Sequence, residues 1–202
     1  MTVGVVAFQG DFQKHLDKLT DLGVDALPVR SVKALDRCNG VVVPGGESTT
    51  IGMLLERFGL LEWLRSHVRE GFPVFGTCAG AILLANEIAG HEQPSIGGLD
   101  VTVKRNAYGR QIASFEADLA PEDGLSSALA EKVDGKPSLF HGVFIRAPRI
   151  VEVRGRVKRL LSFENDPVLV QEGNLLAATF HPELTDDTRL HAYFSDLVRS
   201  RS

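Results

Sequence analysis

The side chain best suited to covalent chemistry in this sequence is a cysteine enclosed by glycines. Residues 76–80 read G-T-C-A-G, a G-x-C-x-G spacing with Cys78 at its centre. This is the thiol counterpart of the G-x-S-x-G turn, which presents a nucleophile between a strand and a helix. The positive end of the following helix would favour the thiolate, and the backbone N–H of Ala79 would serve as an oxyanion donor. The alternative is a small buried cysteine in a tight turn, because the pattern alone also occurs without a catalytic role.

A general base for this thiol is offered by His181, with Glu183 to orient it. The two residues stand in the sequence H-P-E, directly after a predicted strand over residues 175–180. Following this strand, positions i and i+2 point to the same side, so Glu183 can hold one imidazole nitrogen while the other faces Cys78. Taken alone, the H-x-E spacing is weak, and an exposed histidine at a strand end is the more common explanation for His181. A metal site is a further alternative, but the sequence lacks the usual spacing of zinc ligands.

A glycine-rich loop is a candidate for substrate binding. Residues 44–50 read P-G-G-E-S-T-T and follow a predicted strand. The glycines, Gly46 among them, allow backbone amides to approach a ligand, and Glu47 and the hydroxyl of Ser48 can bind an ammonium or a carboxylate group. A phosphate-binding loop is the alternative, but the lysine that such loops carry is absent. In either case Ser48 or Thr49 is predicted to cap the helix that follows.

Two further segments each supply an arginine that can bind a carboxylate. Residues 105–111 read R-N-A-Y-G-R-Q, and residues 144–148 read F-I-R-A-P. The guanidinium of Arg105 or Arg146 can contact both oxygens of a carboxylate at once. Taken singly, an arginine in such a segment is more often part of a surface ion pair.

The remaining cysteine and histidines show no pattern that predicts chemistry. Cys38 is interpreted as structural, and two cysteines are too few for a disulfide framework. His141 lies near residues 144–148 only in sequence. The other four histidines are expected to be solvated or to cap helices; they are His15, His67, His91 and His191.

The elements that must position these residues alternate between strand and helix in the first half of the chain. Strands are predicted over residues 3–8, 25–29, 41–43 and 73–76, and helices over residues 12–22, 49–58, 60–70 and 79–89. Gly23 and Gly59 mark helix boundaries. Strands that alternate with helices build a parallel sheet, so Cys78 should lie at the carboxyl edge where such sheets bind ligands.

The second half is more typical of antiparallel pairing. Short strands are predicted over residues 99–103, 112–116, 139–145, 150–153, 157–163, 168–171 and 175–180. An amphipathic helix over residues 187–200 closes the chain and is expected to pack on the sheet. The polar residues 121–137 are expected to form an exposed insertion. The predicted fold class is therefore α/β, with a mixed sheet and some strands in a satellite layer.

Composition limits the partners of this chain. It has 202 residues, 22 Lys and Arg against 26 Asp and Glu, and a formal net charge of −4. We expect a single domain over residues 1–202 with one substantial core. The lack of a basic cluster argues against nucleic acid or an anionic membrane surface as a partner. No run approaches the about 18 apolar residues of a membrane span, and the first residues lack the cationic flank of a signal peptide, so a cytoplasmic location is expected.

Together these segments resemble a known family. The motifs G-G-E-S-T, G-T-C-A-G, R-N-A-Y-G-R-Q, F-I-R-A-P and F-H-P-E-L are similar to those of the glutaminase subunits of pyridoxal 5′-phosphate synthase, a branch of the class I glutamine amidotransferases. The resemblance covers almost the whole chain. The cysteine turn and H-P-E mark the superfamily, whereas the other three motifs are specific to this branch.

The resemblance implies a fold, an activity and a partner. The implied fold is a flavodoxin-like three-layer αβα sandwich with a mixed, mostly parallel central sheet. The implied activity is hydrolysis of glutamine to glutamate and ammonia, with no cofactor and no metal. The implied partner is a synthase subunit, a TIM barrel in a large hetero-oligomeric complex, which uses the ammonia to build pyridoxal 5′-phosphate.

The resemblance also assigns roles to residues of this chain. Cys78 is matched to the nucleophile, and His181 and Glu183 complete the triad. The backbone N–H groups of Gly46 and Ala79 form the oxyanion hole. The residues matched to glutamine binding are Gly46, Glu47, Ser48, Arg105, Ile145 and Arg146. One departure is the stretch from Gly124 to Ser138, which is longer than the family leads us to expect.

Three other functions are weighed against this one. A glutaminase that serves another synthase would share the triad but lack the branch-specific motifs. A thiol chaperone or protease-like relative commonly has a histidine directly after the cysteine, where this chain has Ala79. A redox-sensing module would use an exposed cysteine without a base, and His181 with Glu183 speaks against it.

Overall fold

The computed structural model describes residues 1–105, 114–122, 125, 129, 132–133, 136–137 and 139–201. The arginine-bearing segment at residues 105–111 is therefore described only at Arg105. Most of the predicted insertion at residues 121–137, and of the stretch from Gly124 to Ser138, also lies outside the described residues.

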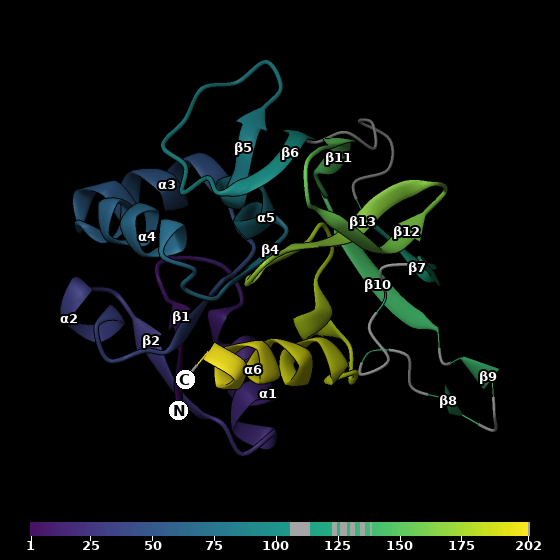
Figure 1. Cartoon of the computed structure of the whole chain (residues 1–202), viewed down its shortest axis with the longest axis horizontal. Coiled ribbons are helices and arrows are strands. Elements are labelled where there is room, and N and C mark those ends of the chain that lie inside the picture. The colour runs from purple at the N-terminus through teal and green to yellow at the C-terminus, as the bar shows by residue number, and fades with distance from the viewer. Residues whose placement is uncertain are drawn as a thin grey trace.

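Five parallel strands form one half of the central sheet, in the order β14-β4-β3-β1-β2 (Figure 1). Their bounds are β1 (Thr2–Val6), β2 (Asp25–Val29), β3 (Gly40–Val43), β4 (Val74–Thr77) and β14 (Leu175–Ala178). Strand β14 comes from the far end of the chain and pairs with β4, so that Ala178 lies opposite Thr77. This pairing brings the residues after β14 beside Cys78.

Antiparallel strands extend this sheet beyond β14 to nine strands, in the order β10-β7-β12-β13. They are β7 (Ser114–Pro121), β10 (Phe140–Ile145), β12 (Lys158–Phe163) and β13 (Asp166–Glu172). A separate sheet has the order β11-β6-β5, with β5 (Ala85–Ile88), β6 (Leu99–Lys104) and β11 (Arg149–Val153). A short pair consists of β8 (Lys132–Val133) and β9 (Lys136–Pro137). The predicted mixed sheet with a satellite layer is confirmed.

Helices cover both faces of the sheet, which makes three layers (Figure 1). They are α1 (Phe12–Asp21), α2 (Val32–Leu35), α3 (Ser48–Arg57), α4 (Leu60–Arg69), α5 (Ala79–Leu84) and α6 (Arg189–Arg201), with a 3₁₀ turn, η1 (Pro182–Leu184). Side chains alternate along each strand. Val41 and Val43 pack with α3 and α4 on one face, whereas Val42 packs with α1 and α6 on the other. The α/β/α architecture is confirmed.

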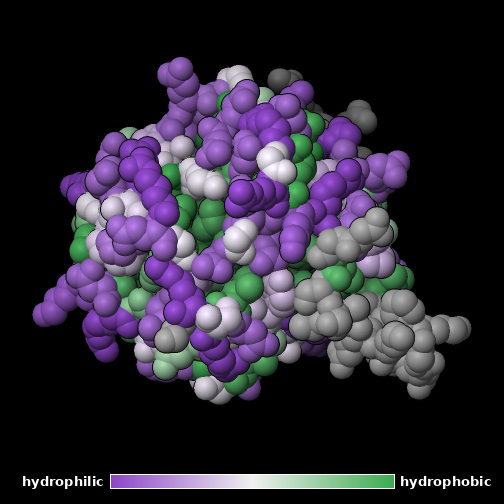
Figure 2. Space-filling model, in the orientation of Figure 1, coloured by the Kyte–Doolittle hydropathy of each residue, from purple (hydrophilic) through white to green (hydrophobic). Residues whose placement is uncertain are grey.

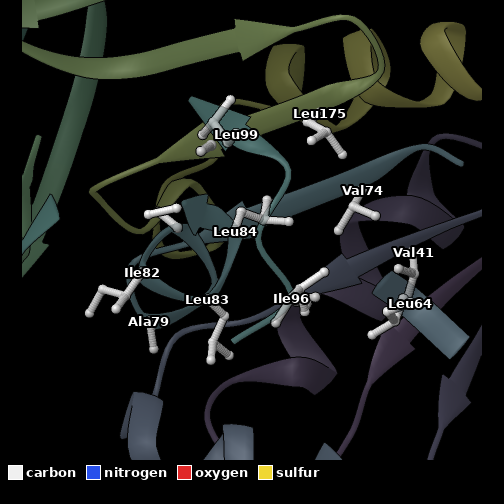
Figure 3. Close-up of a cluster of buried hydrophobic side chains, with 14 of the residues drawn as sticks. Val41, Leu64, Val74, Ala79, Ile82, Leu83, Leu84, Ile96, Leu99 and Leu175 are labelled. Atoms are coloured by element: carbon white, nitrogen blue, oxygen red, sulfur yellow. The ribbon is translucent and has the colours of Figure 1, made fainter. Parts of the chain in front are cut away.

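Helix α5 is anchored in the core on all sides. All six of its residues are buried, as expected for a helix without a polar face. Leu83 and Leu84 are fully buried in the cluster that also contains Val74, Ile96 and Leu99 (Figure 3). Burial of one such leucine contributes about 1.5–3 kcal/mol. The helix that follows Cys78 is therefore held firmly in place.

The helix predicted over residues 79–89 is shorter than the sequence indicated. It ends at Leu84, and Ala85–Ile88 form β5 instead, which pairs in parallel with β6. The apolar run at residues 81–85 fits a helix equally well by local pattern. Tertiary pairing with β6 overrides that preference, because it satisfies the backbone N–H and C=O groups of residues 85–88.

The face shown in Figure 2 is predominantly hydrophilic, with hydrophobic residues in patches between hydrophilic ones. Within the described part of the chain, no helix has both the length and the apolar character needed to cross a bilayer.

Candidate active site

Cys78 occupies a strained turn between β4 and α5. Its backbone has φ 49° and ψ −102°, in a region that residues other than glycine rarely adopt. Such a conformation costs about 1–3 kcal/mol and persists only where the surroundings enforce it. The flanking glycines show how they do so. A Cβ on Gly80 would lie 1.9 Å from the carbonyl oxygen of Val43, and one on Gly76 would lie 2.5 Å from the backbone of Gly80.

The Cys78 thiol faces the end of β10. Its Sγ lies 3.8 Å from the carbonyl oxygen of Ile145, to which the S–H can donate, and the residue is only 6% exposed. Ala79 is the first residue of α5. Its N–H has no acceptor within the helix, because the first N–H groups of any helix lack one. A donor therefore stands directly beside the sulfur.

His181 and Glu183 meet next to this thiol. The N–H of His181 donates to Val143 of β10 at 2.8 Å, and its Nδ1 lies 2.7 Å from Glu183 Oε1. The sequence argument placed both residues on an extended segment, and this was wrong, because Glu183 lies on the 3₁₀ turn η1. The turn brings the carboxylate back to the imidazole within two residues.

The two side chains are held in their charged forms. Burial lowers the pKa of His181, but hydrogen bonds and charge interactions with Cys78 and Glu183 outweigh it and raise the pKa to about 10. Burial likewise opposes ionisation of Glu183, but its interactions with His15 and His181 hold its pKa well below the usual range. An ionised carboxylate next to an imidazole stabilises the imidazolium. The imidazolium is the state that a histidine base enters when it takes a proton.

The glycine-rich loop packs directly on this pair. A Cβ on Gly45 would lie 2.5 Å from His181 Cε1 and 3.4 Å from Cys78 Cβ, so only glycine fits. Gly46 has φ 144°, and the next N–H, that of Glu47, donates to Gln9 Oε1 at 2.8 Å. The loop therefore lies against the thiol and imidazole.

Glu47 caps α3, a role predicted for Ser48 or Thr49. Its carboxylate accepts hydrogen bonds from the N–H groups of Thr49 and Thr50, because a carboxylate is a strong acceptor at a helix N-terminus. Arg105 Nη2 lies 2.7 Å from Glu47 Oε1. Partial burial would raise the pKa of Glu47, but these hydrogen bonds and the arginine charge lower it to about 2. Arg105 therefore reaches the loop, although its guanidinium already binds Glu47.

Gln93 is a member of this cluster that the sequence analysis missed. Its Oε1 accepts from Ser48 Oγ at 3.0 Å and from Arg105 Nη1 at 3.1 Å. Its Nε2 is buried without a partner among the described residues. Gln93 stands in an irregular segment without a motif, so no local signal pointed to it. It fixes the position of Arg105 and of the Ser48 hydroxyl.

Ile145 and Arg146 lie at and just after the end of β10, which the Cys78 thiol faces. Ile145 ends β10 and is 40% exposed, and its carbonyl oxygen faces Cys78. Arg146 has φ 46° and an exposed side chain. It makes no hydrogen bond or ion pair with the part of the chain that the structure describes. Within those ranges its guanidinium is unengaged, in contrast to that of Arg105, which binds Glu47.

Two histidines that were expected to be solvated or capping are fully buried behind the site. His15 Nε2 lies 3.3 Å from Glu183 Oε2, and His15 Nδ1 lies 2.9 Å from His191 Nε2. A signal was present in the sequence. His15 follows Phe12 by three residues and precedes Leu19 by four, which places it on the apolar face of its helix.

Cys38, His67 and His141 do not join this cluster. Burial raises the pKa of the Cys38 thiol to about 11, which keeps it protonated and unreactive. His67 stacks on Trp63, and His141 contacts Glu116 and Asp118 at an exposed position. Within the described ranges, no three His, Cys, Asp or Glu side chains are grouped so that they could hold a metal ion.

Comparisons with known proteins agree on one family. The family model described as the SNO glutamine amidotransferase family matches residues 5–200. The subunit PdxT of pyridoxal 5′-phosphate synthase from Thermus thermophilus is 51% identical over 198 residues, which cover 97% of each chain. The same subunit from Thermosipho africanus is 45% identical over 199 residues, which cover 98% of this chain and all of the relative.

Solved structures show the same fold. A structure described as a glutamine amidotransferase superposes with a TM-score of 0.87 at 48% identity and covers 98% of both chains. The PurLQS structure from Thermotoga maritima has a TM-score of 0.71 at 17% identity, over 96% of this chain and 97% of that one. At that identity the likeness concerns the fold alone.

Proposed function

The chain belongs to the SNO glutamine amidotransferase family, and from this membership we propose that it hydrolyses glutamine and supplies ammonia for the synthesis of pyridoxal 5′-phosphate. The observation that carries the proposal is the pair formed by His181 and Glu183, 2.7 Å apart, beside a cysteine in a strained strand-to-helix turn. A nucleophile, a base and an orienting carboxylate are the parts that acyl transfer requires.

The first half-reaction forms a thioester. The Cys78 thiolate attacks the side-chain amide carbon of glutamine, a C–S bond forms, and the carbonyl oxygen becomes an oxyanion. The backbone N–H groups of Gly46 and Ala79 donate to that oxygen. His181, which holds a proton because of Glu183, gives it to the departing nitrogen as the C–N bond breaks. Ammonia leaves and a γ-glutamyl thioester remains.

The second half-reaction restores the enzyme. His181 now takes a proton from water, which attacks the thioester carbon, and the C–S bond breaks. Glutamate leaves, and the proton returns to the thiol and imidazole pair. Glu183 keeps the imidazole in one tautomer with Nδ1 protonated, so that Nε2 faces the reacting atoms in both halves.

Glutamine is held at its amino-acid end. We assign the guanidinium of Arg146 to the substrate carboxylate and the Glu47 carboxylate to its ammonium group. Arg105 shapes this site by holding Glu47, with which it forms a 2.7 Å ion pair. Ser48 and the backbone of Ile145 complete the contacts.

The partner is the synthase subunit. In this proposal it is a TIM barrel within a large hetero-oligomeric complex, and docking completes the oxyanion hole by a backbone change at Gly46. The positive φ of Gly46 is consistent with such a change, because glycine crosses between backbone regions at little cost. The cytoplasmic location expected from the sequence stays a prediction.

The test is a glutaminase assay of three proteins, wild type, Cys78→Ala and the control Cys38→Ala, each alone and mixed with the synthase subunit. We expect little glutamate release from wild type alone and a large rise with synthase. Cys78→Ala should release none, whereas Cys38→Ala should match wild type. Glutamate release by Cys78→Ala above background would refute the nucleophile.

A second arm tests the ammonia supply. Synthase mixed with Cys78→Ala should make pyridoxal 5′-phosphate from ammonium salt but not from glutamine. Failure of ammonium to restore synthesis would refute the role as ammonia supplier, and full glutaminase activity of the isolated chain would refute activation by docking.

A further inference from the structure

Behind the carboxylate of Glu183 lies a pair of buried histidines that the mechanism above does not use. His15 comes from α1 and His191 from α6, and both are 0% exposed. His15 Nδ1 lies 2.9 Å from His191 Nε2, and His15 Nε2 lies 3.3 Å from both Glu183 Oε2 and Thr77 Oγ1. The contacts therefore run without a break from His191 to the imidazole beside the thiol.

The positions of the protons in this chain of contacts follow from the partners. Glu183 Oε1 accepts from His181 Nδ1 at 2.7 Å, and a hydrogen on His15 Nε2 is attracted to the negative charge of Glu183 Oε2 at 3.3 Å, so both nitrogens carry hydrogen. The Nδ1 of His15 is then an acceptor and takes the hydrogen of His191 Nε2. Nδ1 of His191, which has no partner among the described residues, is left without a hydrogen.

The reverse order is unfavourable. It would place a buried N–H on His191 Nδ1 without an acceptor and turn a nitrogen lone pair of His15 toward the Glu183 carboxylate. Burial and the nearby His15 lower the pKa of His191 to about 3, so a second proton on His191 is also excluded near neutral pH. One order of protons is thus favoured from end to end.

We propose that His15, supported by His191, is a positioning residue that orients Glu183 through its second carboxylate oxygen and thereby keeps His181 Nε2 directed at Cys78. The inference rests on the proposed function, since it concerns the same reaction. Glu183 needs such support because of its place in the fold. Glu183 lies on the short turn η1 rather than on a strand, and the packing of α1 against η1 places His15 behind it.

The contact between His15 and Glu183 orients the carboxylate but is not a strong hydrogen bond. At 3.3 Å it is longer than the 2.7 Å bond between His181 and Glu183, and Oε2 makes no well-aligned hydrogen bond among the described residues. A donor at that place still disfavours rotation of the carboxylate away from the imidazole. Partners that orient metal-bound histidines change activity by about 10- to 100-fold when they are mutated, and we expect a partner of Glu183 to act on the same scale.

Substitutions at His15 distinguish the effect of its hydrogen-bond donor from the effect of its side-chain size. A glutamine amide reaches the place of Nε2, an asparagine amide reaches that of Nδ1, and phenylalanine keeps the ring without a donor. We expect His15→Phe and His15→Asn to lower kcat of the complex about 10- to 100-fold, with KM within about twofold of wild type. His15→Gln should keep most of kcat. Leu19→Ala, a buried change on the same helix, is the control and should keep kcat per folded molecule.

A spectroscopic readout on the isolated chain does not depend on the reaction. The proton of the bond between His181 and Glu183 should give a downfield NMR signal, assigned by its loss in His181→Gln. We expect the signal in wild type, Leu19→Ala and His15→Gln, and a shifted or broadened signal in His15→Phe.

The outcomes distinguish the two proposals. An unchanged signal in His15→Phe, or equal kcat in His15→Asn and His15→Gln, overturns the positioning role. If wild type with synthase releases no glutamate while the signal depends on His15 as expected, the proposed function fails and the positioning role stands.

Discussion

Replacement of Glu183 by glutamine tests the arrangement of protons most directly. The carboxylate accepts from His181 at 2.7 Å and faces His15 at 3.3 Å, whereas an amide has one acceptor and one donor end. If the amide NH₂ faces His181, the imidazole must carry its proton on Nε2 and cannot take the proton of Cys78. If NH₂ faces His15, both buried histidines must change tautomer and leave an N–H of His191 unpaired, which costs about 1–3 kcal/mol.

The expected loss of activity follows from these two orientations and from the lost charge. Removal of the carboxylate also removes a partner that raises the pKa of His181 to about 10, so the imidazolium formed during the reaction is less stable. In dissected triads, loss of the orienting acid lowers kcat by about 10⁴-fold and loss of the base by about 10⁶-fold. We therefore expect Glu183→Gln to raise the barrier by about 5–6 kcal/mol and His181→Asn by about 8 kcal/mol.

The assay compares kcat of the two variants in the saturated complex, with equal folded fractions checked by circular dichroism. Background is set by Cys78→Ala. A loss in Glu183→Gln equal to or greater than that in His181→Asn would refute the division between orienting acid and proton carrier.

Three further predictions concern the loop, the substrate cation and the buried histidines. Gly45→Ala places a Cβ 2.5 Å from His181 Cε1, and a displacement of about 1 Å at such a group lowers kcat by about 10²-fold, so wild-type kcat would contradict the packing. Arg146→Ala removes a charged hydrogen bond of about 1.5–3 kcal/mol, so KM for glutamine should rise at least tenfold, and an unchanged KM would exclude this contact. The folded pKa of His191, about 3, lies below its ordinary 6.5, so its contribution to stability is complete above pH 6.5 and is lost as the pH falls toward 3. We therefore expect that, in urea unfolding between pH 7 and 4, the slope of the unfolding free energy against pH corresponds to about one proton fewer in His191→Phe than in wild type. Equal slopes in the two proteins would mean that His191 titrates normally.

Local patterns in the sequence determined most of the elements and the chemical parts. Apolar residues that recur every two or every 3.6 positions mark the buried side of a strand or a helix. Gly23 follows the end of one helix and Gly59 precedes the start of another, and both have a positive φ. The turn that presents Cys78 between a strand and a helix was also predicted from its glycines, and glycines at positions 76 and 80 do allow the close approach of α5 to its neighbours. These features depend on residues near one another in the chain.

Only the tertiary structure decided which remote groups meet. The pairing of β14 with β4 brings the segment of His181 to Cys78 across about half of the chain, and a local pattern does not specify a strand's neighbour. The stretch at residues 85–88 became a strand because β6 lay beside it. His15 was misjudged for the same reason. Its helical position shows that it faces inward, but its role depends on a carboxylate brought behind the sheet edge by η1, and burial pattern alone carries no information about that partner.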